Sequence, residues 1–119
     1  MAKKNTPPIQ NVMHEIIIYA ANVLKNINKD IKTWIGDDFC CNLIKILKNV
    51  IYAWNCIDNL KKKNLLLDAK GDLLVIEEEL KLLSTLKAVS LKQEAYLGEK
   101  IANVYIQLEG WINSCEKNN

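Results

Sequence analysis

The side chains best suited to chemistry in this sequence are its sixteen basic residues, all of which are lysine. Residues 1–70 hold eleven lysines against six acidic residues, a surplus of +5, whereas residues 71–119 hold five against eight. A basic half-chain attracts nucleic acid, because each lysine that meets a phosphate releases a condensed counterion. Lysine lacks the planar, two-pronged donor of arginine, so contacts to a phosphate backbone are favoured over the reading of base edges.

Three groups of lysines are candidates for such a surface. They are Lys29 and Lys32 in an irregular stretch, Lys45 and Lys48 on one side of a helix, and the run Lys61, Lys62 and Lys63. Two interpretations are open: a solvated helix face with favourable cations at a helix C-terminus, or a surface that contacts phosphate. With a formal net charge of +2, one chain would bind RNA weakly, and an oligomer that repeats the patch would bind better.

Other chemistries lack the residues that they need. The four cysteines have no Cys-x-x-Cys spacing, and the chain has one histidine, His14. The carboxylates at 37–38 and 77–79 fit a helix start and a solvated helix face, and no Glu-x-x-His motif of a di-iron bundle occurs. We therefore expect a protein that is not an enzyme, with no catalytic residues, no metal site and no cofactor.

Length and hydropathy indicate one domain in the cytoplasm. The chain has 119 residues, half of them hydrophobic, which is the size and composition of a single globular domain. No secretory signal is visible, and the first apolar run, at 16–23, follows His14 and Glu15 and is too short and too broken to cross a bilayer. We expect a cytoplasmic protein that makes no contact with a membrane.

The elements that must position the lysines are helices. Both prolines lie at positions 7 and 8, so no proline interrupts the chain downstream. Apolar periodicity predicts four helices with short links, which pack as an antiparallel up-down-up-down four-helix bundle. The predicted ranges are a flexible basic tail at 1–7, a bundle at 8–115 with helices at 8–26, 37–62, 65–87 and 91–115, and a frayed C-terminus at 116–119.

Local signals set the predicted helix boundaries. Thr6 before two prolines marks the start of the first helix. The lysine run at 61–63 is expected to close the second helix, because cations suit a helix C-terminus. Ser90 and Gln93 form a capping box that begins the last helix.

Apolar residues recur three or four positions apart in each helix and mark the expected core. The stripes are Val12, Ile16, Tyr19, Val23 and Ile27; Phe39, Leu43, Ile46, Val50, Trp54 and Ile57; Ala69, Leu73, Ile76, Leu80 and Leu83; and Leu97, Ile101, Val104, Leu108, Ile112 and Cys115. Three glutamates, Glu77, Glu78 and Glu79, are expected on the solvated side of the third helix.

Two tryptophans outside the clearest core positions have alternative roles. Trp34 is expected to lock the irregular stretch against the bundle. Trp111 adjoins Gly110 and the seam formed by Leu108 and Ile112, so it lies either in the core or at an interface between subunits. A glycine beside it permits the close approach of another helix.

Four segments, taken in order, carry a resemblance to a known family. Residues 27–36 are similar to Phe-Pro-Arg-x-Tyr-x-x-x-Leu-Gly without its proline, and residues 80–83 to Leu-Arg-Leu-Leu. Residues 86–93 resemble Leu-x-x-Leu-Ser-x-x-Gln, and residues 103–111 resemble a reduced Glu-Ile-Gly-Arg-Met-Leu-Gly-Gly-Trp. The whole resembles the accessory variability determinant (Avd) family of diversity-generating retroelements. That family is a branch of the bacterial four-helix-bundle superfamily that also includes proteins encoded in 23S rRNA intervening sequences.

The resemblance implies a homopentameric barrel that binds a retroelement reverse transcriptase and its template RNA, and so supports mutagenic cDNA synthesis. Lys29, Lys32 and Lys81 stand where the family carries arginines, so the resemblance adds Lys81 to the candidate binding residues. Two alternatives stay open. One is a protein of the sister branch, bound to 23S rRNA or ribosomes, and the other is a protein-only interaction module.

Overall fold

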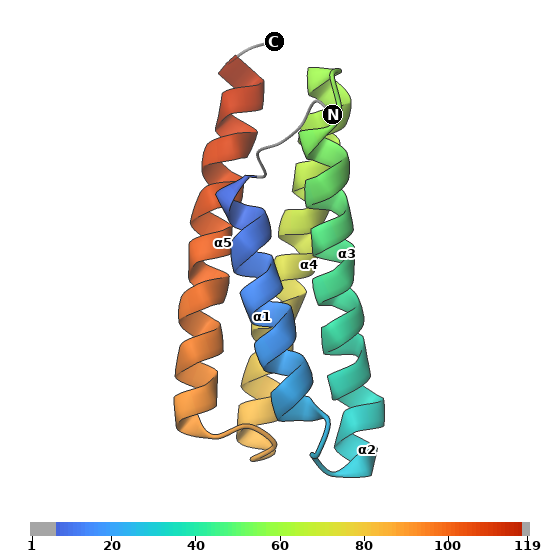
Figure 1. Ribbon diagram of the computed structural model, residues 1–119, viewed down its shortest axis with the longest axis vertical. Coiled ribbons are helices and arrows are strands. Elements are labelled where there is room, and N and C mark those ends of the chain that lie inside the picture. The colour runs from blue at the N-terminus through green and yellow to red at the C-terminus, as the bar shows by residue number, and fades with distance from the viewer. Residues whose placement is uncertain (1–6, 118–119) are drawn as a thin grey trace.

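The computed structural model describes residues 7–117 and confirms an all-α four-helix bundle in that range (Figure 1). Neighbouring helices run antiparallel; α1 packs mainly on α3 and α5, and α4 packs on the same two helices. A homopentamer stays a prediction, since one chain is described. The elements are α1 (Pro8–Leu24), α2 (Lys29–Ile31), the π-helical turn η1 (Lys32–Gly36), α3 (Asp37–Trp54), α4 (Asn59–Thr85) and α5 (Leu91–Lys117).

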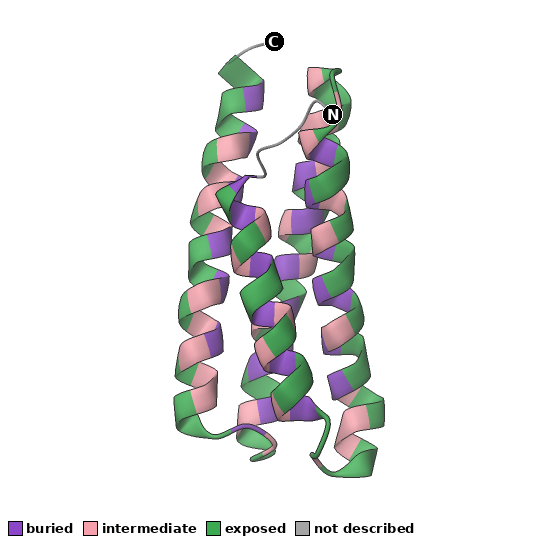
Figure 2. Cartoon of the chain, in the orientation of Figure 1, coloured by how far each residue is buried: buried purple, intermediate pink, exposed green. Residues whose placement is uncertain are grey.

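The core lies between the inner faces of the four long helices, where Figure 2 shows the buried residues. Every predicted stripe residue of α4 and α5 is buried, as predicted. The α1 stripe is rotated from its predicted position, because this helix carries apolar residues on most of its surface. Its buried residues are Ile9, Met13, Ile16, Ala20 and Leu24, and the predicted Val12, Tyr19 and Val23 lie at the edge of the core.

The predicted break between the first two helices is much shorter than expected. Asn28 caps a new helix start, since its Oδ1 accepts hydrogen bonds from the backbone N–H groups of Asp30 (2.9 Å) and Ile31 (3.3 Å). From Lys29 the chain stays helical through α2, η1 and α3. The π-helical turn widens the helix by one residue before α3 begins. Residues 29–36 are therefore the first turns of the second helix.

The boundary between the second and third helices also differs from the prediction. α3 ends at Trp54, and Asp58 caps α4 by accepting from the backbone N–H groups of Leu60 (2.9 Å) and Lys61 (3.4 Å). The lysine run therefore lies in the first turns of α4 and does not close α3. Ile57, predicted as core, lies in the link and is 95% exposed. The aspartate cap outweighs the dipole preference on which the prediction rested.

The turn between α4 and α5 confirms its predicted cap. Ser90 Oγ accepts from the Gln93 backbone N–H at 3.0 Å, and Gln93 Oε1 accepts from the Ser90 N–H at 2.8 Å. α4 ends at Thr85, two residues early, in a Schellman turn with Lys87 at φ 62°. α5 continues to Lys117, so residues 116–117, predicted to fray, are helical. The Thr6 prediction and positions 118–119 lie outside the described residues.

Glu79 contradicts the prediction of a solvated side chain, since it is 8% exposed. Asn42 Nδ2 donates to Glu79 Oε1 at 3.1 Å and to Asp38 Oδ2 at 3.0 Å, which joins α3 to α4. Burial, together with the neighbouring Asp38 carboxyl, raises the pKa of Glu79 to about 7. This residue lies at the inner edge of α4, one turn beyond the buried Ile76.

Candidate nucleic-acid interface

The lysines of the described residues divide into an ion-paired set and an unpaired set. Four of the pairs join different helices along the sides of the bundle, and the fifth lies within α4. The pairs are Lys45–Asp72 (3.5 Å), Lys63–Glu116 (2.9 Å), Lys70–Glu109, Lys100–Glu15 (2.7 Å) and, within α4, Lys81–Glu78 (3.2 Å). These lysines already have a counter-charge and contribute little net positive potential.

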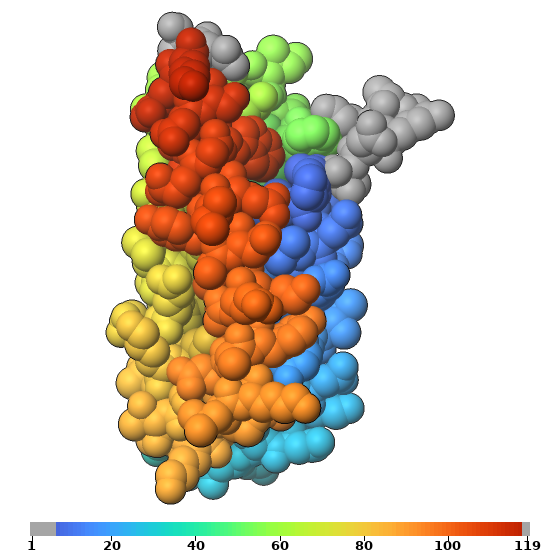
Figure 3. Space-filling view, turned by 90° about the vertical axis from the view of Figure 1, so that its left-hand side faces the viewer, coloured from blue at the N-terminus to red at the C-terminus, as the bar shows by residue number. Residues whose placement is uncertain are grey.

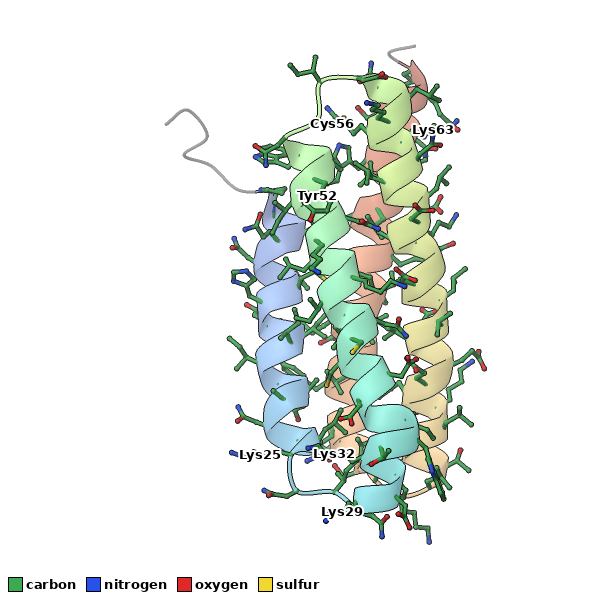
Figure 4. All side chains as sticks on the ribbon, turned by 90° about the vertical axis from the view of Figure 1, so that its right-hand side faces the viewer. Lys25, Lys29, Lys32, Tyr52, Cys56 and Lys63 are labelled. Carbon is green, nitrogen blue, oxygen red and sulfur yellow. The ribbon has the colours of Figure 1, made fainter. Side chains whose placement is uncertain are left out.

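Five unpaired lysines gather at one end of the bundle, where the α1–α2 link meets the α4–α5 turn. We name this set the basic end. Figure 4 shows three of its members beside the α1–α2 link, and the other two follow α4 and begin α5. None forms an ion pair with another described residue. The members are Lys25, Lys29, Lys32, Lys87 and Lys92.

Favourable interactions with helix dipoles explain the positions of only some of the lysines in the basic end. Lys25 and Lys87 follow the C-termini of α1 and α4, where the helix dipole favours a cation. Lys29 and Lys92 lie in the first turns of α2 and α5, where the same dipole disfavours one. Positions where a residue departs from such a local preference, with no compensating contact, are found mostly at functional sites. The basic end is therefore the best candidate for contact with phosphate.

Two further features lie at the same end. A hollow of about 540 Å³ separates the α1–α2 link from the α4–α5 turn, and Asn26, Lys87 and Gln93 are among its lining residues. Trp34, in η1, is 72% exposed. An exposed indole beside lysines suits stacking on an unpaired base. The prediction that Trp34 locks the chain against the bundle is therefore wrong, because the π-helical turn carries the ring outward.

Only two of the predicted lysines, Lys29 and Lys32, lie at the basic end. The other predicted lysines lie elsewhere: Lys61, Lys62 and Lys63 at the opposite end, Lys45 and Lys48 along α3, and Lys81 on α4. Sequence reasoning missed three members of the basic end, Lys25, Lys87 and Lys92. Antiparallel topology was the signal that could have found them, because the first and third links of such a bundle share one end.

Within the chain, the predicted seam around Trp111 packs on α3, and a role at an interface between subunits stays a prediction. Leu108 is buried, and the half-buried Trp111 ring meets the Trp54 ring edge-on, with centroids 6.0 Å apart. Gly110 is exposed, and a Cβ built there would meet nothing within 4 Å. The glycine therefore does not serve a close approach between helices of this chain.

A second surface follows the side of α4 that faces away from the core. We name it the α4 outer face; Figure 3 shows α4 at the surface beside α5 along the length of the bundle. Gly71 lies within it and has open space above. A helix that carries apolar residues on two opposite sides usually packs against protein on both sides. The exposed apolar residues are Leu60, Leu67, Leu74, Val75 and Leu82.

Residues 7–117 hold no cluster of metal-ligating side chains and no membrane-spanning helix. No group of three or more His, Cys, Asp or Glu side chains in that range could hold a metal ion. No helix in it is both long enough and apolar enough to cross a membrane. All four cysteines are free thiols, and burial, with Asp37 nearby, raises the pKa of Cys40.

Comparison with known proteins identifies the fold. No family model matches the sequence, and no curated protein matches it. The structure is similar to the crystal structure of a protein of unknown function, from the S23 ribosomal protein family of Bacteroides thetaiotaomicron VPI-5482. The TM-score is 0.80 at 16% sequence identity, over 88% of this chain and 95% of that one. The likeness shows that the two chains share a four-helix-bundle fold, and the resemblance to the accessory variability determinant family stays a prediction.

Proposed function

We propose that this chain is a non-enzymatic scaffold that binds RNA at its basic end and associates with copies of itself through the α4 outer face. Its role would be that of an accessory protein to a retroelement reverse transcriptase, as the sequence resemblance implies. The observation that carries the proposal is the segregation of the lysines. Those on the sides of the bundle are mostly neutralised by ion pairs, whereas the five of the basic end are not.

RNA binding by the basic end has a measurable signature. If all five lysines meet phosphates of a single strand, the slope of log affinity against log salt is about −3 to −4 per chain. A lysine contacts phosphate as a point charge and does not read the bases. Its contribution to the affinity is therefore the same for every RNA sequence. Self-association would multiply this electrostatic contribution to RNA affinity, because each copy adds another basic end to the same particle.

Self-association is supported by the α4 outer face. Its five apolar residues line the side of α4 opposite the core, and each is between 41% and 60% exposed in the single chain. Several large apolar side chains exposed on one side of a helix mark a candidate interaction site, here with the exposed Glu78 between Leu74 and Leu82. A homopentamer would cover it with a second copy, and the reverse transcriptase is the other partner that the proposal includes.

The test combines mass with salt-dependent RNA binding. Light scattering should give the mass of an oligomer, and that mass should rise when structured RNA is added at low salt. Replacing Lys25, Lys29 and Lys32 by Gln should weaken binding and reduce the salt slope by about 2. The matched control replaces Lys48, Lys62 and Lys117 by Gln, which removes equal charge from unpaired lysines elsewhere. Equal losses in the two variants, or a single-chain mass with no RNA retained at low salt, would overturn the proposal.

A second candidate is a protein bound to ribosomal RNA. Its support is the similarity to a structure whose family name is that of a ribosomal protein. Both candidates predict RNA binding at the basic end, so affinity alone does not separate them. Co-purification with a reverse transcriptase would favour the first, and co-sedimentation with ribosomal subunits would favour the second. Capture of protein partners alone would favour an interaction module.

A further inference from the structure

A pocket of about 440 Å³ opens between the last turn of α3 and the first turns of α4, at the end opposite the basic end. We name it the α3–α4 pocket. Figure 4 shows Tyr52 and Cys56, which approach it from α3 and the following link. The α4 side supplies an apolar residue and three polar ones. The lining residues are Tyr52, Cys56, Lys61, Asn64, Leu65 and Asp68.

The polar side chains that α4 contributes to this pocket have no partners within the described residues. The side chains of Lys61, Asn64 and Asp68 form no hydrogen bond or ion pair there. The contrast with their neighbours is sharp, since Asp72, one turn further along α4, pairs with Lys45, and Lys63 pairs with Glu116. A cationic donor, an amide and a carboxylate, all solvent-exposed, thus share one concave site in which no other described side chain competes with a ligand for them.

The apolar parts of the pocket suit a flat ring. Tyr52 is 56% exposed and makes no contact with another aromatic ring of the described chain. Leu65 contributes an apolar wall. Bases of unpaired nucleotides stack on such exposed aromatic side chains, whatever their sequence context. A base lying against Tyr52 would direct its polar edge toward α4.

The spacing along α4 matches the two ends of a nucleotide. Lys61 and Asp68 are seven residues apart, about 10 Å along the helix axis, so one can meet a phosphate while the other meets a base edge. Asp58 already caps the N-terminal amides of α4, which leaves Lys61 as the phosphate contact. An ionised Asp68 accepts hydrogen bonds only, and it can accept two side by side. Guanine presents two adjacent donors, N1–H and N2–H, on its Watson–Crick edge, whereas adenine presents an acceptor there.

We propose that the α3–α4 pocket binds an unpaired guanine nucleotide of RNA, with the base on Tyr52, its donor edge on Asp68 and its phosphate on Lys61. The inference rests on the proposed RNA-binding function and adds a base-selective contact to it. The basic end would supply affinity that is uniform across sequences, and the pocket would select where a strand is held.

The first experiment uses Cys56 as a reporter inside the pocket. The rate of its alkylation by iodoacetamide is followed by peptide mass spectrometry with GMP, AMP, CMP or UMP present. GMP should slow alkylation of Cys56 several-fold more than the other three. Cys41, exposed on α3, is the internal control and should react at an unchanged rate. Equal effects of the four nucleotides, or none, would overturn the proposal.

The second experiment tests the contacts in the full chain. Replacing Tyr52 by Ala should weaken binding of a guanine-containing single-stranded RNA by about tenfold. Asp68→Asn should abolish the preference for that RNA over one with adenine in place of guanine, whereas Asp30→Asn, an exposed control at the other end, should not. If the triple variant Lys25→Gln, Lys29→Gln and Lys32→Gln reduces RNA binding while the pocket variants do not, the pocket proposal fails and the proposed RNA binding at the basic end stands. If GMP protects Cys56 but no RNA is retained, the proposed function fails and the pocket stands.

Discussion

Replacing Glu79 by Gln should change how the stability of the bundle depends on pH. Glu79 is held between α3 and α4, where Asn42 Nδ2 donates to it and to Asp38. Burial and the Asp38 carboxyl raise its pKa from 4.5 to about 7. Glutamine keeps the shape and accepts the same hydrogen bond from Asn42, but it carries no charge at any pH.

The sign follows from proton linkage. Between about pH 4.5 and 7 the folded chain binds a proton at Glu79 that the unfolded chain has already lost, so the free energy of unfolding falls as pH rises. The full shift in pKa corresponds to at most about 3 kcal/mol. Asp38 is exposed, so solvent screens part of the repulsion and we expect about 2 kcal/mol. Glu79→Gln should therefore exceed the stability of the parent by less than about 1 kcal/mol near pH 5 and by about 2 kcal/mol near pH 8.

The assay is urea unfolding followed by circular dichroism between about pH 5 and 8. Staying within this range keeps the Cys40 thiol protonated, since its pKa is raised by burial, Asp37 and, more weakly, Glu79. Glu78→Gln is the matched control, because Glu78 is exposed and pairs only with Lys81. Its curve should run parallel to that of the parent. Parallel curves for Glu79→Gln as well would refute the reasoning, since they would show that Glu79 titrates normally in the folded chain.

Three further predictions concern individual residues. Leu74→Glu places a charge in the α4 outer face and should reduce the light-scattering mass to that of one chain, whereas Leu91→Glu, at an exposed leucine outside that face, should not. Lys87→Gly should raise the free energy of unfolding by about 1 kcal/mol, because glycine adopts the left-handed φ of 62° without steric cost; a lower melting temperature would contradict this. Ser90→Ala removes the acceptor for the Gln93 N–H and should lower it by about 1 kcal/mol, read from urea midpoints.

Sequence reasoning succeeded where the signal was local. The capping box at Ser90 and the three-and-four spacing of α5 depend on neighbours within one helix, so both were predictable. The first helix is different because Ile16, Ile17 and Ile18 follow one another, and apolar periodicity cannot choose the inner side of such a helix. In the fold Ile16 is buried and Ile18 is 62% exposed.

The same distinction applies to the candidate sites. Whether a lysine has a counter-charge depends on which helix lies beside it, as the pairing of Lys45 with Asp72 across α3 and α4 shows. A count of lysines along the chain therefore overestimates the basic surface on the sides of the bundle. The α3–α4 pocket was likewise out of reach, because Tyr52 and Asp68 become neighbours only when α4 folds back along α3.

The two proposed surfaces constrain each other through symmetry. Copies joined through the α4 outer face by a head-to-tail contact form a ring when the rotation between them closes, and in a ring with its axis along the bundles every basic end lies on the same rim. A two-fold dimer with antiparallel bundles would instead separate the two basic ends. Only the ring adds the lysine charges on one surface, so it alone predicts a salt slope that steepens with assembly. The Leu74→Glu variant separates these cases, because its slope should fall to the single-chain value if the ring exists and stay unchanged if RNA binds each chain independently.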